Sequence, residues 1–144
     1  VTGHVRMGRE VLSPLIRKGD ADLVIALEMT EALRAREYAF QGTNFLINEK
    51  FVAYTLGPEK EEVVSDVADM PFEKKVVPAG KIAVEKTGRE ITAGVYLLAR
   101  AVCAGLIPLN EKSLKRAVEK TVPEKYLDIN MKAVEAGFSA PELA

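Results

Sequence analysis

The chain has 144 residues, a length that suits one domain with one hydrophobic core. Hydrophobic residues make up 48% of the chain and charged residues 28%, which is the composition of an ordinary globular domain. Its 20 basic and 21 acidic residues are interspersed and give a net charge of −1, so we predict neither nucleic acid nor a membrane as a partner.

The N-terminal part of the chain predicts a hairpin followed by a buried strand. Residues 2–7 alternate in hydrophobicity like a half-buried strand, Gly8 permits a tight turn, and residues 10–12 would return as the second arm. Residues 23–27 form a short continuous apolar run, which is typical of a strand buried on both faces of an α/β sheet.

A helix and further strands are expected next. Residues 31–37 are rich in helix formers and follow Thr30, the expected N-cap. Residues 44–48 predict the next buried strand, and this strand–helix–strand order favours a parallel crossover. Residues 51–56 predict another strand, and the acidic residues 59–62 predict a solvated surface segment.

The remainder of the chain is mostly helical in its pattern. Residues 75–78 predict a short strand, and residues 79–86 predict a helix that ends at Gly88. Residues 91–106 are apolar on nearly all sides, which predicts a central buried helix. Within that helix, Cys103 is expected to behave as a small buried apolar residue.

Two last helices complete the predicted fold. Asn110 is the expected N-cap of a helix that runs to Val122, and a final helix over residues 125–136 is expected to stop at Gly137. We therefore predict a single three-layer α/β/α domain with a mostly parallel or mixed sheet and a helical C-terminal third.

Four polar residues are candidates for a cofactor-binding site: His4, Arg6, Glu28 and Asn48. His4 and Arg6 lie two apart on a predicted strand and would face the same way, either as a cationic site for a carboxylate or phosphate or as a structural pair. Glu28 and Asn48 follow neighbouring parallel strands, at the edge where crevices form, although Glu28 would serve equally well as a helix cap.

The sequence predicts no catalytic residue and no metal ligand in this chain. It contains no glycine-rich phosphate loop, no Gly-x-Ser-x-Gly and no Cys-x-x-Cys. Cys103 and His4 are the single residues of their kinds, too few for an iron–sulfur cluster or a typical zinc centre. A composition without disulfides or a recognisable signal peptide favours the cytoplasm.

Several motifs in chain order resemble one family. The ending, residues 122–138, is similar to the close of indolepyruvate oxidoreductase beta subunits, and the earlier motifs resemble the gamma-type domain of pyruvate and other 2-oxoacid:ferredoxin oxidoreductases. The resemblance spans most of the chain and is weakest over about residues 50–74. The earlier motifs are VTGHVRMG (residues 1–8), VLSPLI (11–16), GDADLVIALE (19–28) and EALR (31–34).

The resemblance implies a subunit of an enzyme that converts a 2-oxoacid, coenzyme A and oxidised ferredoxin to an acyl-coenzyme A, carbon dioxide and reduced ferredoxin. Thiamine diphosphate and the iron–sulfur clusters would belong to a large partner subunit. This chain would carry no cofactor, would meet ferredoxin only indirectly and would be inactive by itself. The C-terminal similarity favours indolepyruvate among the possible substrates.

The resemblance is incomplete at the N-terminus. Members of the family usually begin with a strand and a Gly-x-Gly-Gly-Gln-Gly loop, which residues 1–144 do not contain. We therefore expect residues 1–144 to be a gamma-type domain without its glycine-loop segment. Two alternatives stay open: a stand-alone small-ligand-binding α/β domain that uses Glu28, Asn48 and His4, or a scaffold that dimerises.

Overall fold

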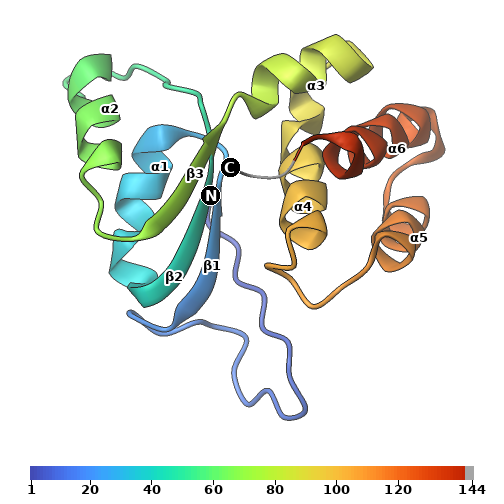
Figure 1. The fold of residues 1–144 in the computed structure, drawn as a ribbon, viewed down its shortest axis with the longest axis horizontal. Helices are drawn as coiled ribbons and strands as arrows, with labels where there is room; N and C mark the ends of the chain where they lie inside the picture. The colour runs from blue at the N-terminus through green and yellow to red at the C-terminus, as the bar shows by residue number, and fades with distance from the viewer. Residues whose placement is uncertain (142–144) are drawn as a thin grey trace.

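The computed structural model describes residues 1–141, and within them the sheet has three strands. They are β1 (Ala21–Ala26), β2 (Ala39–Asn48) and β3 (Glu73–Val77), in the order β1-β2-β3 (Figure 1). The central strand β2 pairs in parallel with both neighbours, so the carboxyl ends of all three strands lie at one edge of the sheet.

Helices cover both faces of this sheet (Figure 1). Helices α1 (Met29–Arg34) and α2 (Lys60–Ala68) pack on one face, and α3 (Ala79–Thr87) and α4 (Ala93–Cys103) pack on the other. Helices α5 (Glu111–Thr121) and α6 (Glu124–Ser139) lie outside α4, and short 3-10 turns occupy Ala35–Tyr38 and Glu90–Thr92. The predicted three-layer α/β/α fold with a helical C-terminal third is confirmed.

Alternating side chains of β2 separate the two apolar cores. Phe45 and Ile47 point toward α1 and α2, whereas Leu46, between them, belongs to the core beneath α3 and α4. All three side chains are at most 1% exposed. The buried parallel strand predicted over residues 44–48 is therefore present, and β2 begins several residues earlier than the apolar run indicates.

Two predicted helix ends are confirmed by their capping geometry. Asn110 caps α5 because its Oδ1 accepts a hydrogen bond from the backbone N–H of Ser113 at 2.9 Å. Gly88 ends α3 with a φ of +73°, a left-handed conformation that favours glycine.

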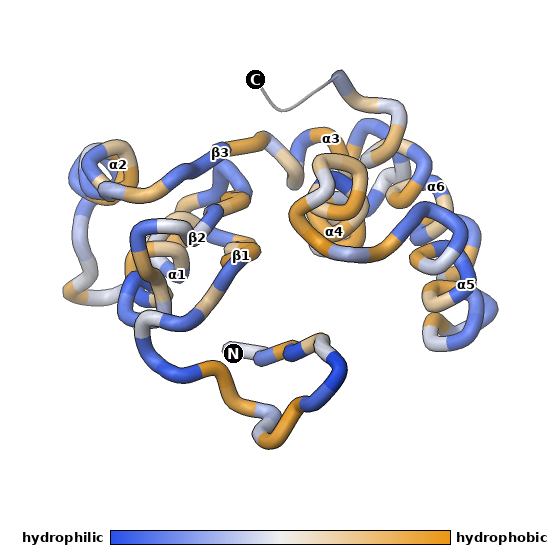
Figure 2. The backbone as a smooth tube through the Cα atoms, turned by 60° about the horizontal axis from the view of Figure 1, so that its bottom comes forward, coloured by the Kyte–Doolittle hydropathy of each residue, from blue (hydrophilic) through white to orange (hydrophobic). Residues whose placement is uncertain are grey.

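The predicted N-terminal hairpin is wrong in its secondary structure. Residues 2–7 and 10–12 form no strand and belong to an irregular arm that precedes β1. Figure 2 shows this arm beside the body of the protein, with hydrophilic and hydrophobic residues alternating along it. The alternation suits a strand, but the arm forms no ladder with any strand among residues 1–141.

Residues 51–56 also differ from expectation. The predicted strand over residues 51–56 is a loop, which closes with a turn from Tyr54 to Gly57. Residues 59–62 are all exposed, which agrees with the predicted solvated surface segment. They lead into α2, whose Val63 and Val67 lie four residues apart and are both buried against the sheet.

Three further local predictions are wrong. Residues 23–27 are not fully buried, because β1 is an edge strand whose middle residues stay half-buried. Helix α6 continues through Gly137 to Ser139 instead of stopping there. Cys103 is exposed at the end of α4, with its Sγ 3.9 Å from the carbonyl oxygen of Phe138.

Candidate functional site

The carboxyl edge of the sheet carries the polar residues that are best placed for binding. Strand β1 leads into Leu27 and Glu28, β2 ends at Asn48, and β3 leads through Pro78 into α3. Open α/β sheets bind ligands beyond the carboxyl ends of their strands, so this edge is the candidate site.

Asn48 links neighbouring segments of the chain at this edge. Its side chain is only 2% exposed. Its Nδ2 donates a hydrogen bond to the carbonyl oxygen of Leu27 at 3.1 Å, and its Oδ1 accepts one from the backbone N–H of Gly80 at 3.0 Å. Asn48 therefore joins the end of β1 to the start of α3.

We expect Asn48→Ala to lower the free energy of unfolding by about 2 kcal/mol. The substitution removes both hydrogen bonds and leaves a backbone carbonyl and a backbone N–H without their partners. Urea denaturation measures the loss. Asn44→Ala in the same strand is the matched control, because Asn44 is half-buried and should change stability by less than about 0.5 kcal/mol. Equal losses in the two variants would contradict this role for Asn48.

Glu28, rather than Thr30, is the N-cap of α1. Its Oε2 accepts a hydrogen bond from the backbone N–H of Glu31 at 2.7 Å, and a carboxylate at this position also interacts favourably with the helix dipole. The other oxygen of Glu28 is buried and has no hydrogen-bond partner in the described part of the chain, as is also true of the Thr30 hydroxyl. The capping role predicted for Thr30 is therefore wrong.

A cleft of about 430 Å³ lies between the end of β2 and helix α3. Lys50 forms an ion pair with Glu90 beside it, and Lys81 Nζ lies 4.0 Å from Glu49 Oε2, so the opposite charges balance. The lining residues are Asn48, Glu49, Lys50, Gly80, Lys81, Val84 and Glu90.

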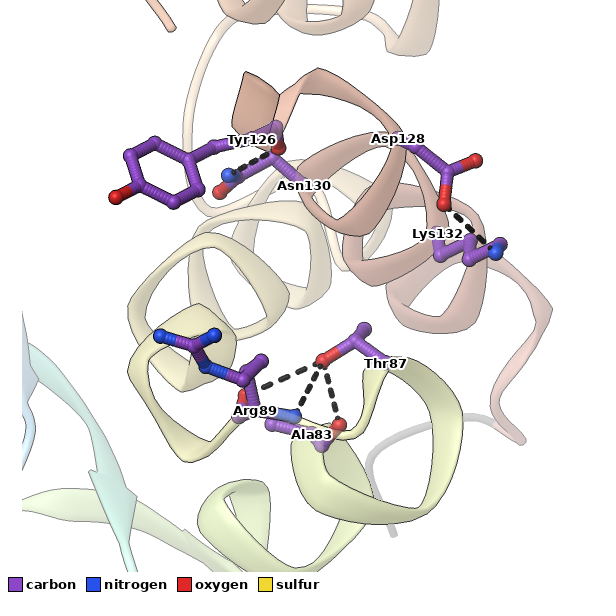
Figure 3. A network of polar contacts seen from close by, with 7 residues as sticks. All are labelled: Ala83, Thr87, Arg89, Tyr126, Asp128, Asn130 and Lys132. Carbon is purple, nitrogen blue, oxygen red and sulfur yellow. Dashed lines mark hydrogen bonds and ion pairs between the residues drawn. The ribbon is translucent and has the colours of Figure 1, made fainter. Parts of the chain in front are cut away.

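The turn between α3 and α4 positions Glu90. Thr87 Oγ1 donates to the carbonyl oxygen of Ala83 at 2.8 Å and accepts a hydrogen bond from the backbone N–H of Arg89 at 3.2 Å (Figure 3). The Thr87 and Thr92 hydroxyls lie 2.9 Å apart, so both ends of the turn are fixed. This anchoring holds Glu90 where its carboxylate reaches Lys50.

His4 and Arg6 lie apart from this cleft, in the N-terminal arm. His4 Nδ1 accepts a hydrogen bond from the backbone N–H of Ile16 at 3.0 Å, and its ring meets Tyr38 edge-on with 5.1 Å between ring centres. Arg6 Nη1 donates to the carbonyl oxygen of Ser13 at 3.1 Å. Both residues line one hollow of the arm and connect its two sides.

The four candidates therefore form two groups rather than one site. Asn48 bonds to the residue before Glu28, so these two are neighbours at the sheet edge. Sequence reasoning did not identify Lys50 and Glu90, whose pairing joins positions 40 residues apart. Among the described residues, no group of three or more His, Cys, Asp or Glu is arranged to hold a metal ion. No described helix is both long and apolar enough to cross a membrane.

Comparison with known proteins identifies similar chains. The indolepyruvate oxidoreductase subunit IorB of Archaeoglobus fulgidus is 30% identical over 143 residues, which cover 94% of this chain and 70% of that protein. The subunit of the same name from Pyrococcus horikoshii is 30% identical over 149 residues, which cover 97% of this chain and 73% of that protein.

Two solved structures share the fold. The gamma subunit of a keto/oxoacid ferredoxin oxidoreductase from Geobacter sulfurreducens has a TM-score of 0.62 and 21% identity, over 81% of this chain and 62% of its own. The pyruvate oxidoreductase subunit PORC of Thermotoga maritima has a TM-score of 0.57 and 22% identity, over 81% of this chain and 61% of its own. This chain thus spans about three-fifths of the length of these structures.

The family model described as pyruvate ferredoxin/flavodoxin oxidoreductase matches residues 1–140, nearly the whole chain. The family resemblance noted in the sequence motifs is thereby confirmed: the chain belongs to the pyruvate ferredoxin/flavodoxin oxidoreductase family.

Proposed function

We propose that this chain is a cofactor-free subunit of a 2-oxoacid:ferredoxin oxidoreductase. The observation that carries the proposal is the family match over residues 1–140. The complex would decarboxylate a 2-oxoacid oxidatively, pass two electrons to ferredoxin and form an acyl-coenzyme A in the cytoplasm. Thiamine diphosphate and iron–sulfur clusters, held by a large partner subunit, would supply that chemistry.

Within this complex the chain would act by packing rather than by catalysis. The cleft at the sheet edge is lined by lysines that pair with glutamates and by Asn48, whose side chain hydrogen-bonds to the backbone. Such a lining suits a docking surface. His4, Arg6 and Asn48 direct polar groups to backbone partners, whereas Glu28 keeps one buried carboxylate oxygen without a partner among the described residues. We propose these four residues as candidates for contact with a ligand or a partner, and we expect the isolated chain to be inactive.

We further propose an aryl pyruvate such as indolepyruvate as the substrate of the complex. Support comes from the curated relatives, which are named as indolepyruvate oxidoreductase subunits. A complex of this kind should show a higher kcat/KM for indolepyruvate than for pyruvate. A preference for pyruvate would contradict the substrate and leave the subunit role intact.

The subunit role predicts that the full-length chain forms a stable complex with the large thiamine- and cluster-binding subunit. The two proteins would be co-expressed, and size-exclusion chromatography would measure whether they elute together. We expect 2-oxoacid-dependent reduction of ferredoxin only when both are present. If the chain elutes alone and leaves the activity of the large subunit unchanged, the proposal fails.

Calorimetry on the isolated chain separates this proposal from the stand-alone binding domain. Saturable binding of coenzyme A or a 2-oxoacid by the chain alone, together with failure to join the large subunit, would favour the stand-alone domain. A self-associated chain that joins no other subunit would favour the dimerising scaffold.

A further inference from the structure

Leu56 has an unusual backbone conformation in the loop after β2. Its φ is +62°, and among the described residues it is the one non-glycine residue with a positive φ. It occupies the third position of the turn from Tyr54 to Gly57, which is closed by a 2.9 Å hydrogen bond from Gly57 N–H to the Tyr54 carbonyl. Glycine or asparagine is preferred at such positions, because a Cβ strains the left-handed region and asparagine can offset this strain with local hydrogen bonds.

Packing within this chain does not offset that strain. The Leu56 side chain is fully exposed, with a relative exposure of 102%, so it makes no apolar contact that would favour leucine here. A strained residue that the rest of the molecule does not need is a reason to look for a role outside the molecule.

Neighbouring residues hold the turn in place. The Tyr54 ring covers Gly57 so closely that a Cβ on Gly57 would lie 2.7 Å from the ring. The Arg34 guanidinium lies 5.4 Å from the centre of the Tyr54 ring and also forms an ion pair with Glu31. The turn is therefore preorganised, which lowers the entropy cost of binding through it.

The residues around Leu56 combine exposed apolar side chains with charges that are unpaired among the described residues, as protein–protein interfaces do. Val52 and Tyr54 in the same loop are 50% and 48% exposed, and the loop begins at the carboxyl edge of the sheet, next to Asn48 and the cleft. At the foot of the loop, Lys60 stands among three exposed acidic residues, and no ion pair involves any of the four in the described part of the chain. The acidic residues are Glu59, Glu61 and Glu62.

We propose that Leu56 inserts into an apolar pocket with a cationic rim on the large subunit of the complex. This inference rests on the proposed subunit function and names a point of contact for it. A two-fold contact with a second copy is less favourable, because it would bring the acidic residues beside the loop close to their own equivalents. A cationic rim on a different protein complements them instead.

The test uses three variants of the full-length chain and measures both binding to the large subunit and thermal unfolding of the free chain. Leu56→Asn should weaken binding about tenfold or more, because the apolar contact is lost. It should leave the thermal midpoint unchanged or raise it, because asparagine tolerates the left-handed conformation. Leu56→Met keeps an apolar side chain and should bind within about threefold of the natural chain.

Leu109→Asn is the matched control, an exposed leucine just before α5, and it should leave the dissociation constant within about twofold. The inference is overturned if Leu56→Asn binds as tightly as the natural chain, if Leu109→Asn weakens binding equally, or if Leu56→Asn lowers the thermal midpoint by several degrees. Failure of the natural chain to bind the large subunit at all would instead overturn the proposed function.

Discussion

Gly137→Ala should lower the free energy of unfolding by about 3 kcal/mol, although alanine is the better helix former. Gly137 lies inside α6 where this helix crosses α4. A Cβ at this position would lie 2.5 Å from the Cβ of Ala99 and 2.9 Å from the carbonyl oxygen of Tyr96. The backbone of α4 cannot yield as a flexible side chain would, so the two helices must move apart and lose part of their packing.

Gly94→Ala is a control with the same chemical change and the opposite expectation. Gly94 also lies in a helix, α4, but a Cβ there would meet only the Leu27 side chain, at an ordinary contact distance of 3.5 Å. Its replacement should raise stability by about 0.5–1 kcal/mol through helix propensity. Chemical denaturation of both variants decides the matter: a stabilised Gly137→Ala would show that α4 and α6 do not pack as closely as the structure indicates.

Gly137 also shows why some helix ends could not be read from the sequence. Glycine after an amphipathic run usually marks the end of a helix, and this rule succeeds at Gly88, where φ is +73°. Position 137 needs glycine because helix α4 lies too close for a Cβ, and not because the chain turns there. A local pattern cannot separate these two uses, because the difference lies in residues of α4 that are far away in the sequence.

The strands were predictable where both faces are buried and less so elsewhere. The apolar run over residues 44–48 identified the inner half of β2. Its outer half, from Ala39, is mostly exposed and contains Gly42, which weakens a strand pattern. This outer half is held instead by Thr43, whose buried hydroxyl donates to the Ala21 carbonyl and accepts from the Phe40 N–H at 2.8 Å.

The position of polar residues at the carboxyl edge of the sheet could be predicted from a general rule, whereas the ion pair at this edge could not. Parallel strands bring their carboxyl ends to one edge, so Glu28 and Asn48 could be placed together from sequence alone. The pairing of Lys50 with Glu90 depends on how the turn after α3 folds back over the sheet. Charged residues make up 28% of the chain, so neither residue stood out among them.

The second large effect is expected from Arg100, a cation only 3% exposed within α4. Its Nη1 donates to the carbonyl oxygens of Gly137 and Ala140, each at 3.1 Å, and its Nη2 donates to that of Pro141. The carbonyls of Gly137 and Ala140 belong to the C-terminal end of α6, where a positive charge interacts favourably with the helix dipole, and that of Pro141 follows directly after it. In the described part of the chain, no carboxylate forms an ion pair with Arg100, so these bonds are what balances its buried charge.

Arg100→Met should therefore lower the free energy of unfolding by about 3 kcal/mol, because it leaves the end of α6 without its donors. Arg100→Lys keeps the charge but cannot reach three carbonyls from one ammonium group, so it should lose about half as much. Urea denaturation at low and high salt measures both losses, and burial of the cation should make them nearly independent of salt. A methionine variant as stable as the natural chain would mean that burying the Arg100 charge costs as much as its hydrogen bonds return, and that apolar packing is sufficient to hold α6 on α4.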